Sequence, residues 1–243
     1  MTHHYMAITS PHNEKLKAIR NLHQRRRWRE RSGRFVAEGE DLLAAADAAG
    51  WEAVERYCAT GSGLLGVEVE PSLLASASGL ASGTRALAVY QERWALVAAG
   101  PLCVYLHGLH DPGNVGAVLR CAQAFGASCV AIGPGTADPF GPKAVRASMG
   151  AVFGVPLARA QGPGELPGHK IALVAGAGVP LARLADTTLG DATLLVGAER
   201  EGLPDEIVAA ADVIVHIPIR TDSLNAAMAA TVALYEVSRM AAG

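Results

Sequence analysis

The sequence predicts an α/β protein with two units, of which the larger, C-terminal unit contains an open parallel sheet. The chain has 243 residues, enough for one or two domains, and half of them are apolar. After residue 100, short apolar runs alternate with segments of helical periodicity. Apolar runs with little polar alternation are typical of strands buried on both faces of a parallel sheet. The segment 91–101, which ends in Gly100-Pro101, is expected to link the two units.

The N-terminal unit is predicted to be a small α/β unit. Its first helix is expected over 14–33, because Leu16, Ile19 and Leu22 recur at helical spacing and Gly33 is a suitable end. The elements expected after it are a strand at 35–36, a helix over 38–49, and strands at 54–58 and 86–90.

The C-terminal unit follows from about residue 100 to the end of the chain. Its last helix is nearly apolar from Ala226 to Leu234, so we expect it to be buried, for instance against a second subunit. The expected strands are 102–106, 129–132, 171–174, 193–196 and 213–217, and the expected helices are 115–125, 142–150, 204–211 and 223–241.

Basic residues are concentrated at the start of the chain. The first 35 residues hold nine basic and two acidic side chains, a local charge of +7, whereas the remainder holds 12 basic and 21 acidic ones. Such an excess is the electrostatic footprint of a protein that contacts a polyanion. The run Arg25, Arg26 and Arg27 is therefore a candidate for nucleic-acid contact, and the alternative is a solvated helix face.

Several classes of protein and site do not fit the sequence. A membrane span is not expected because breakers interrupt every long apolar run, and the start of the chain has no secretory signal core. The four cysteines form no CxxC pair, which favours reduced thiols in the cytoplasm over a disulfide framework or a zinc ribbon. The chain has no G-x-x-x-x-G-K-[ST] loop, and His107 and His110 lack a third metal ligand, so no metal is expected.

Three loops follow predicted strands at the sheet edge where such sheets bind ligands. In the first loop, Asn114 is a candidate helix N-cap, and Arg120 lies six residues further along the helix. In the second, Gly197 would let a ligand approach the strand end, and Glu199 is a lone carboxylate. In the third, Ser223 or Asp222 is a candidate cap of the last helix. The loops are 107–114, 197–204 and 217–225.

Taken together, these loops resemble the three motifs of the SpoU (TrmH-like) RNA ribose 2′-O-methyltransferases of the SPOUT superfamily. The N-terminal unit resembles the substrate-binding domain of the same family, which is related to a ribosomal-protein fold. The matching segments are Asp111–Arg120 (DPGNVGAVLR), Gly197–Leu203 (GAEREGL), Ile217–Ile219 with Ser223-Leu224-Asn225 and Tyr235-Glu236, Ala144–Ala151, Asn13–Lys17 and Phe35–Gly39.

The resemblance implies an RNA-binding domain over 1–95 and a methyltransferase domain over 96–243. The C-terminal segment of such a domain threads through a loop to form a deep trefoil knot, a rare exception to the rule that chains are not knotted. The knot holds S-adenosylmethionine, and the enzyme is a homodimer that pairs across the last helix and the first-motif helix. The cofactor contacts that the resemblance implies are Gly176, Gly197, Ile217 and Leu224.

Methyl transfer to a ribose 2′-OH requires that the hydroxyl be oriented in line with the methyl group and lose its proton. The family proposal gives this role to the first-motif arginine, but a guanidinium holds its proton too tightly to act as a base. We therefore expect Arg120 to anchor an RNA phosphate and polarise the hydroxyl, with phosphate as the proton acceptor. The residues expected to fix the arginine, the ribose and the loop are Asn114, Glu199, Ser223 and Asn225.

The leading interpretation is an S-adenosylmethionine-dependent RNA 2′-O-methyltransferase that acts on ribosomal RNA. The N-terminal domain favours ribosomal RNA, because minimal transfer-RNA enzymes of this group rely on short terminal extensions. The alternatives are a transfer-RNA enzyme, a resistance-type ribosomal RNA methylase, or a non-catalytic RNA-binding factor in ribosome assembly. The intact polar set argues against the last of these.

Overall fold

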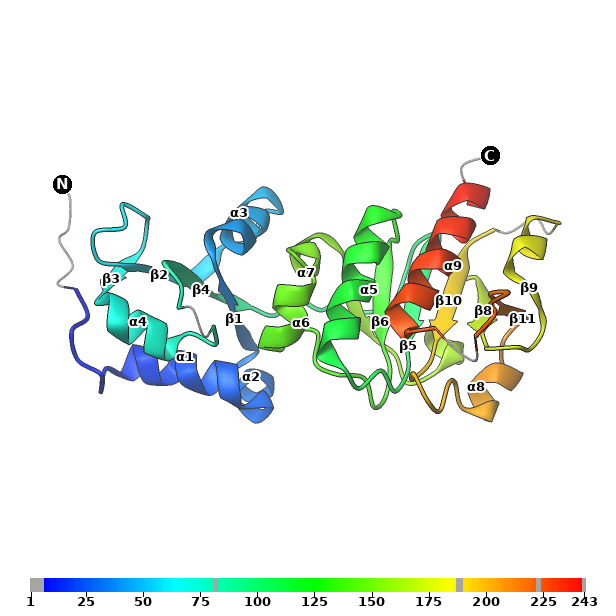
Figure 1. Ribbon diagram of the computed structural model, residues 1–243, viewed down its shortest axis with the longest axis horizontal. Helices are drawn as coiled ribbons and strands as arrows, with labels where there is room; N and C mark the ends of the chain where they lie inside the picture. Colours follow the sequence, from blue (N-terminus) through cyan, green and yellow to red (C-terminus); the bar gives the residue numbers. More distant parts are fainter. Residues whose placement is uncertain (1–6, 81–82, 187–189, 222–223, 242–243) are drawn as a thin grey trace.

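A computed structural model describes residues 7–80, 83–186, 190–221 and 224–241 of the chain. The N-terminal and C-terminal units lie side by side along the long axis of the molecule (Figure 1). In the N-terminal unit a four-stranded sheet has the order β1-β4-β2-β3. Strand β4 pairs antiparallel with β1 and β2, and β3 pairs parallel with β2. The strands are β1 (Arg34–Glu38), β2 (Ala53–Ala59), β3 (Val67–Val69) and β4 (Ala86–Gln91).

Helices cover both faces of this small sheet. On one face, α1 (Glu14–Gln24) and α4 (Pro71–Ala77) bury Leu16, Ile19 and Leu74 against the strands. On the other face, α3 (Glu40–Ala48) packs on β1 and β4. The strand β3 and the helix α4 were not predicted, because three and seven residues are too few to establish a periodicity.

The predicted helix over 14–33 is wrong in one respect, because it is two helices. Arg25 has an extended conformation (φ −127°, ψ 108°) that ends α1, and α2 (Arg26–Ser32) begins directly after it. The change of direction buries Arg29, whose Nη1 donates to the carbonyl of Leu22 at 2.6 Å. Gly33 ends α2 in the left-handed region (φ 61°), as predicted.

The C-terminal unit is built on a seven-stranded sheet with the order β7-β6-β5-β10-β8-β11-β9, and each of its strand pairs is parallel. This confirms the predicted parallel α/β fold. The two-residue and three-residue strands β9 and β7 at its edges were not predicted. The strands are β5 (Leu102–Leu106), β6 (Cys129–Ile132), β7 (Leu157–Arg159), β8 (His169–Leu173), β9 (Val179–Pro180), β10 (Ala192–Val196) and β11 (Val213–His216).

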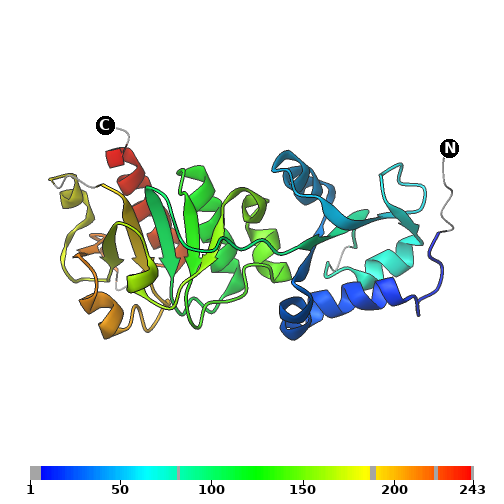
Figure 2. The same ribbon diagram turned by 180° about the vertical axis from the view of Figure 1, so that it is seen from behind.

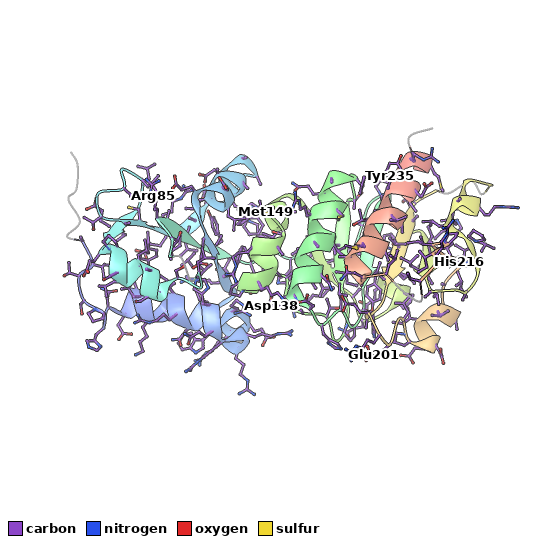
Figure 3. All side chains as sticks on the ribbon, in the orientation of Figure 1. Arg85, Asp138, Met149, Glu201, His216 and Tyr235 are labelled. Atoms are coloured by element: carbon purple, nitrogen blue, oxygen red, sulfur yellow. The ribbon has the colours of Figure 1, made fainter. Side chains whose placement is uncertain are left out.

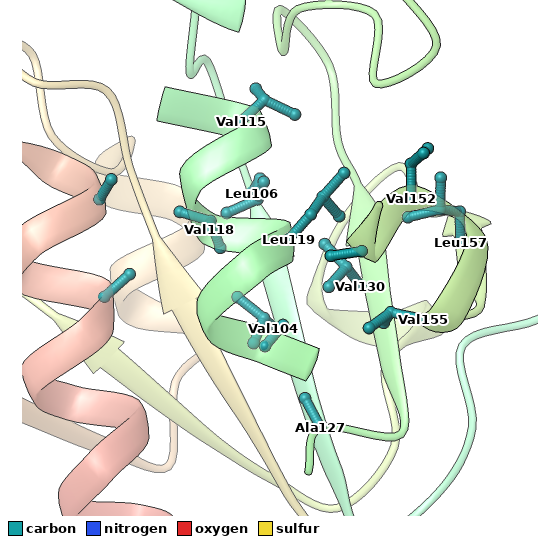
Figure 4. Close-up of a cluster of buried hydrophobic side chains, with 14 of the residues drawn as sticks. Val104, Leu106, Val115, Val118, Leu119, Ala127, Val130, Val152, Val155 and Leu157 are labelled. Carbon is teal, nitrogen blue, oxygen red and sulfur yellow. The ribbon is translucent and has the colours of Figure 1, made fainter. Parts of the chain in front are cut away.

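Two long helices, α5 (Pro112–Ala124) and α9 (Ala226–Ala241), lie together on one face of this sheet. They are in front of the strands in Figure 1 and behind them in Figure 2. Figure 4 shows how Val115, Val118 and Leu119 of α5 pack on strand residues such as Val104 and Leu106. The shorter segments are α6 (Pro142–Ala147), α7 (Ala151–Gly154), α8 (Asp205–Ala209), and 3-10 turns at Pro163–Glu165 and Leu181–Asp186.

The helix predicted over 142–150 is interrupted, because Met149 and Gly150 have positive φ values of 50° and 95° between α6 and α7. The helices of the described segments are too short or too polar to cross a membrane. The trefoil knot that the resemblance implies stays a prediction.

The two units share one hydrophobic core. Phe35 from β1 lies 4.7 Å from Phe140 of the C-terminal unit, measured between ring centroids. The Nε1 of Trp51 donates to the buried carbonyl of Phe153 at 2.9 Å. Arg29 of α2 also donates through Nε to Asp138 at 2.7 Å, and both side chains are largely buried. Because aromatic packing, a buried hydrogen bond and a largely buried ion pair join the two units, the N-terminal unit is held in a fixed position on the C-terminal unit.

Candidate active site

A cavity of about 560 Å³ opens at the carboxyl edge of the seven-stranded sheet. It lies between the loops that follow β8, β10 and β11, which is the edge expected from the sequence. Its volume is in the range of small-molecule pockets, about 300–1,000 Å³. The lining includes Leu173, Val196, Gly197, Leu203, Ile217 and Leu224.

The loop after β10 closes on itself. Ala198 and Gly202 exchange two backbone hydrogen bonds of 3.0 Å, so that the residues between them form a tight turn at the rim. A Cβ at Gly197 would lie 2.2 Å from the carbonyl carbon of Gly202. We expected a glycine at position 197 because it would leave room for a ligand. The structure gives another reason for the glycine, because the backbone of the same loop occupies the space that a Cβ would need. Gly197 still lines the cavity.

The structure brings together three of the five predicted polar residues. The Nδ2 of Asn225 donates to Oδ1 of Asn114 at 3.1 Å and to Oε1 of Glu199 at 3.0 Å, and Nδ2 of Asn114 donates to the same Glu199 oxygen. The three side chains come from α5, the β10 loop and the start of α9, and Glu199 also lines the cavity. We call this set the amide–carboxylate cluster.

The caps of the two long helices differ from those expected. Asp111, not Asn114, caps α5, because Pro112 takes the first helical position and the carboxylate of Asp111 accepts from the amide of Gly113 at 3.2 Å. Asn114 is thus in the first turn of the helix, where its side chain is free to reach Glu199. Asn225 caps α9, since its Oδ1 accepts from the amide of Ala227 at 3.0 Å. The predicted site residue and cap Ser223 lies outside the described residues.

Arg120 is exposed on α5, less than two turns beyond Asn114. Among the described residues, none forms a hydrogen bond or an ion pair with its guanidinium group. It does not join the amide–carboxylate cluster within one chain. Its side chain is therefore available to a ligand or to another subunit.

Of the predicted cofactor contacts, Gly197, Ile217 and Leu224 line the cavity, and Gly176 does not. Gly176 is exposed in the turn after β8, with a φ of 68°, next to Ala175, which is part of the lining. A left-handed conformation of this kind accounts for a glycine without any ligand.

Two side chains at the first loop have a role that the sequence did not predict: Lys143 was not singled out, and His107 was considered only as a metal ligand. Lys143 of α6 forms an ion pair of 2.6 Å with Asp111, and its hydrogen bond holds the pKa of that carboxyl below the usual value. Burial lowers the pKa of His107, whose Nδ1 lies 3.1 Å from the hydroxyl of Tyr105. In the described part of the chain, no three His, Cys, Asp or Glu side chains are arranged to hold a metal ion.

The predicted RNA-contact residues Arg25, Arg26 and Arg27 are exposed, at and after the break between α1 and α2. Arg26 pairs with Glu30 at 2.8 Å, whereas the structure records no such partner for the other two among the described residues. Trp28, which follows them, is 43% exposed. An exposed aromatic ring among arginines is a recognisable feature of single-strand binding surfaces, and the sequence analysis did not use it.

Comparison with known proteins covers both units. The model of the SpoU rRNA Methylase family matches residues 101–235, and that of the MRM3-like substrate binding domain matches residues 13–94. A 23S rRNA (uridine(2479)-2′-O)-methyltransferase of Streptomyces viridochromogenes is 37% identical over 142 residues, which are 53% of this chain and 49% of that relative. The chain thus matches only about half the length of this relative. An uncharacterised tRNA/rRNA methyltransferase of Synechocystis is 30% identical over 98% of this chain and 96% of its own length.

Solved structures match nearly the whole chain. The AdoMet-bound rRNA methyltransferase from Sinorhizobium meliloti has a TM-score of 0.85 and 30% identity, and the match covers 96% of this chain and 97% of that one. The SpoU methyltransferase AviRb from Streptomyces viridochromogenes, in complex with AdoMet, has a TM-score of 0.84 and 25% identity, covering 95% and 99%. The fold is that of the SPOUT methyltransferases. The chain belongs to the SpoU rRNA methylase family.

Proposed function

We propose that this protein is an S-adenosylmethionine-dependent methyltransferase that methylates a ribose 2′-hydroxyl of ribosomal RNA in the cytoplasm. The amide–carboxylate cluster at the rim of the cavity carries the proposal. A set of hydrogen-bonding groups drawn from three separate loops serves to orient a polar group of a substrate. A non-catalytic RNA-binding protein would not require these groups to converge beside a small-molecule cavity.

The cavity fits S-adenosylmethionine in size and chemistry. Leu173, Val196, Leu203 and Leu224 supply an apolar lining of the kind that covers an aromatic base. The tight turn that Gly197 permits keeps the loop backbone at the cavity wall. When bound, the cofactor supplies an electrophilic methyl group. We propose the cofactor contacts at Gly197, Ile217 and Leu224, with Gly176 beside them.

The residues of this chain orient the hydroxyl and polarise it, and a phosphate of the RNA accepts its proton. Glu199 lies at the cavity rim, where Asn114 and Asn225 hold one of its carboxylate oxygens. Its other oxygen is positioned to accept a hydrogen bond from a ribose hydroxyl. Arg120 anchors a phosphate of the RNA and polarises the 2′-OH, whose proton passes to phosphate as the oxygen takes up the methyl group. Ser223 completes the polar set in the third motif.

A homodimer completes the site. The helix α9 buries one face on the sheet, but Met228, Val232 and Tyr235 on another face are 64%, 39% and 50% exposed. Their spacing of four and three residues places them on one stripe of the helix. A second copy of the chain that covers this stripe and the neighbouring α5 would also bring its own residues close to Arg120.

Ribosomal RNA is the proposed substrate, and transfer RNA is the alternative. The domain that we assign to residues 1–95 exposes the basic run 25–27 at the start of α2. Helix α2 lies on the lower side of the molecule in Figure 1, as does Glu201 in the same orientation in Figure 3. The domain assigned to residues 96–243 carries the cavity. Two relatives favour ribosomal RNA, because their names describe 23S rRNA 2′-O-methyltransferases.

Arg120 provides the test of this function. Arg120→Ala should reduce single-turnover methyl transfer to a transcribed ribosomal RNA by about a hundredfold or more, the scale of a positioned electrostatic group. Arg120→Lys should also be poor, because lysine lacks the planar fork that holds phosphate and hydroxyl together. Light scattering and calorimetry should show that both variants remain dimeric and bind the cofactor.

The matched control is Arg85→Ala. It removes an exposed arginine of the N-terminal unit, whereas Arg120 lies on α5 of the C-terminal unit (Figure 3). It should change the unfolding free energy by less than about 0.5 kcal/mol and leave turnover unchanged. A wild-type rate in Arg120→Ala would show that the arginine has no part in the reaction.

A further inference from the structure

A second cavity, of about 250 Å³, lies at the junction of the two units and shares no lining residue with the cofactor cavity. We call it the junction pocket. Its walls come from α2, the segment after β4, the end of β7 and the loop 133–139 that follows β6. The side chains that carry the argument are Arg26, Glu92, Trp94 and Arg159.

One wall of the junction pocket is flat and cationic. The guanidinium carbon of Arg159 lies 4.3 Å from the centroid of the Trp94 ring. The ring of Phe140 supports Trp94 in an edge contact of 5.2 Å, and Trp94 Nε1 donates to Oε2 of Glu92 at 3.0 Å. The Trp94 ring is therefore fixed at three points. Unstacked bases of RNA stack on aromatic rings and on arginine guanidinium planes of this kind.

A carboxylate faces the same space. Glu92 uses Oε2 for Trp94, and no described residue donates a hydrogen bond to Oε1. Burial raises the pKa of Glu92, because a charged carboxylate is poorly solvated there. An acceptor in such a place gains most from a ligand that presents hydrogen-bond donors.

Two further hollows lie between the junction pocket and the cofactor cavity, and each shares lining residues with its neighbours. A hollow that contains Lys143 shares Arg26 and the residues 135–138 with the junction pocket. A second hollow shares His110 with the hollow that contains Lys143. The same second hollow shares Ala198 and Gly202 with the cofactor cavity. These hollows therefore form a series along the sheet edge, from the basic helix α2 to the β10 loop that carries Glu199.

We propose that the junction pocket binds one guanine base of the RNA strand that carries the methylated nucleotide, and that Glu92 selects this base. The inference rests on the proposed function, because it takes RNA as the substrate. Guanine presents two adjacent donors, N1–H and the N2 amino group. Oε1 of Glu92 accepts from one of them, and Oε2, which keeps a second lone pair beside its hydrogen bond from Trp94, accepts from the other. Uracil, adenine and cytosine each place an acceptor next to a donor on that edge, so one of their groups would repel the carboxylate. Arg26 at the rim meets the phosphate of the bound nucleotide.

The test compares short RNAs that carry a fluorescent label: hexauridylate and the same hexamer with one internal guanosine or inosine. The wild-type protein should bind the guanosine hexamer at least fivefold more tightly than hexauridylate, the lower range of a bidentate base contact. Inosine lacks the N2 amino group and should lose most of this preference. Equal binding of all three RNAs, or of the guanosine and inosine hexamers, would overturn the proposal.

Protein variants locate the preference. Glu92→Gln keeps the shape of the side chain and should reduce the preference for guanosine to less than twofold, with binding of hexauridylate and of cofactor unchanged. Glu52→Gln is the matched control, an exposed acid of the same domain, and should keep the full preference. A guanosine preference that survives in Glu92→Gln would contradict the assignment. None of these binding measurements requires methyl transfer, so failure of the methyltransferase activity and failure of the guanine site are separate results.

Discussion

Gly197→Ala tests whether the turn after β10 builds the cofactor cavity. The new Cβ would lie 2.2 Å from the carbonyl carbon and 2.4 Å from the oxygen of Gly202, and ordinary van der Waals contact begins at 3.4 Å. The turn must move by 0.8 Å for the Cβ to reach the 3.0 Å limit of real contacts, and by 1.2 Å for it to reach ordinary contact at 3.4 Å. Because both colliding atoms belong to the backbone, no side-chain rotation can absorb the displacement. The movement would carry Glu199 away from Asn114 and Asn225.

A displacement of about 1 Å in a positioned group can lower a rate by about a hundredfold. We therefore expect Gly197→Ala to lower the rate of single-turnover methyl transfer by about that factor. It should also weaken cofactor binding in calorimetry, and because no metal is expected, a chelator should not change the affinity of either protein. Gly162→Ala is the control, since a Cβ there meets nothing within 4 Å and the backbone is extended. Wild-type affinity and rate in Gly197→Ala would refute the account of this turn.

Three further predictions concern RNA binding and the junction of the units. Replacing all three arginines of 25–27 with alanine should weaken RNA binding and leave cofactor affinity intact. The slope of log affinity against log salt should fall in magnitude by up to about three, and an unchanged slope would show that these arginines form only a solvated helix face. Asp138→Asn should cost about 3–5 kcal/mol in denaturant unfolding, because it leaves Arg29 buried and unpaired, and a loss below about 1 kcal/mol would contradict this. Burial alone would raise the pKa of Glu38, but His23 and hydrogen bonds from its neighbours outweigh burial, so the pKa is lowered. The ionised carboxylate therefore stabilises the fold fully above about pH 4.5, and this stabilisation is lost as the pH falls. Acid unfolding of Glu38→Gln should lack this component.

The sequence predicted most of the elements that form the large sheet. The runs at 102–106 and 129–132 are buried on both faces, and this burial produces the apolar pattern that identifies them. The break at Arg25 was missed because it accompanies a contact of Arg29 with Asp138, more than a hundred residues away. Local periodicity contains no information about such a partner.

The site was predicted through its residues rather than its geometry. The resemblance named Asn114, Glu199 and Asn225, but their mutual hydrogen bonds depend on loops from three distant strands and helices. Gly197 was selected because a glycine would leave room for a ligand, whereas the structure shows that a Cβ there would collide with the backbone of Gly202 in the same loop. Glu92 and Trp94 lay in a segment interpreted as a linker, because only the docking of the two units shows that they line a pocket.

Mapping of the methylated atom tests the central claim most directly. The purified protein is incubated with transcribed ribosomal RNA and isotopically labelled S-adenosylmethionine, and the digested RNA is analysed by mass spectrometry. We predict label in a 2′-O-methylnucleoside at a defined position, and its loss with Arg120→Ala. Label on a base, or no label in RNA while the protein binds the cofactor, would contradict the account.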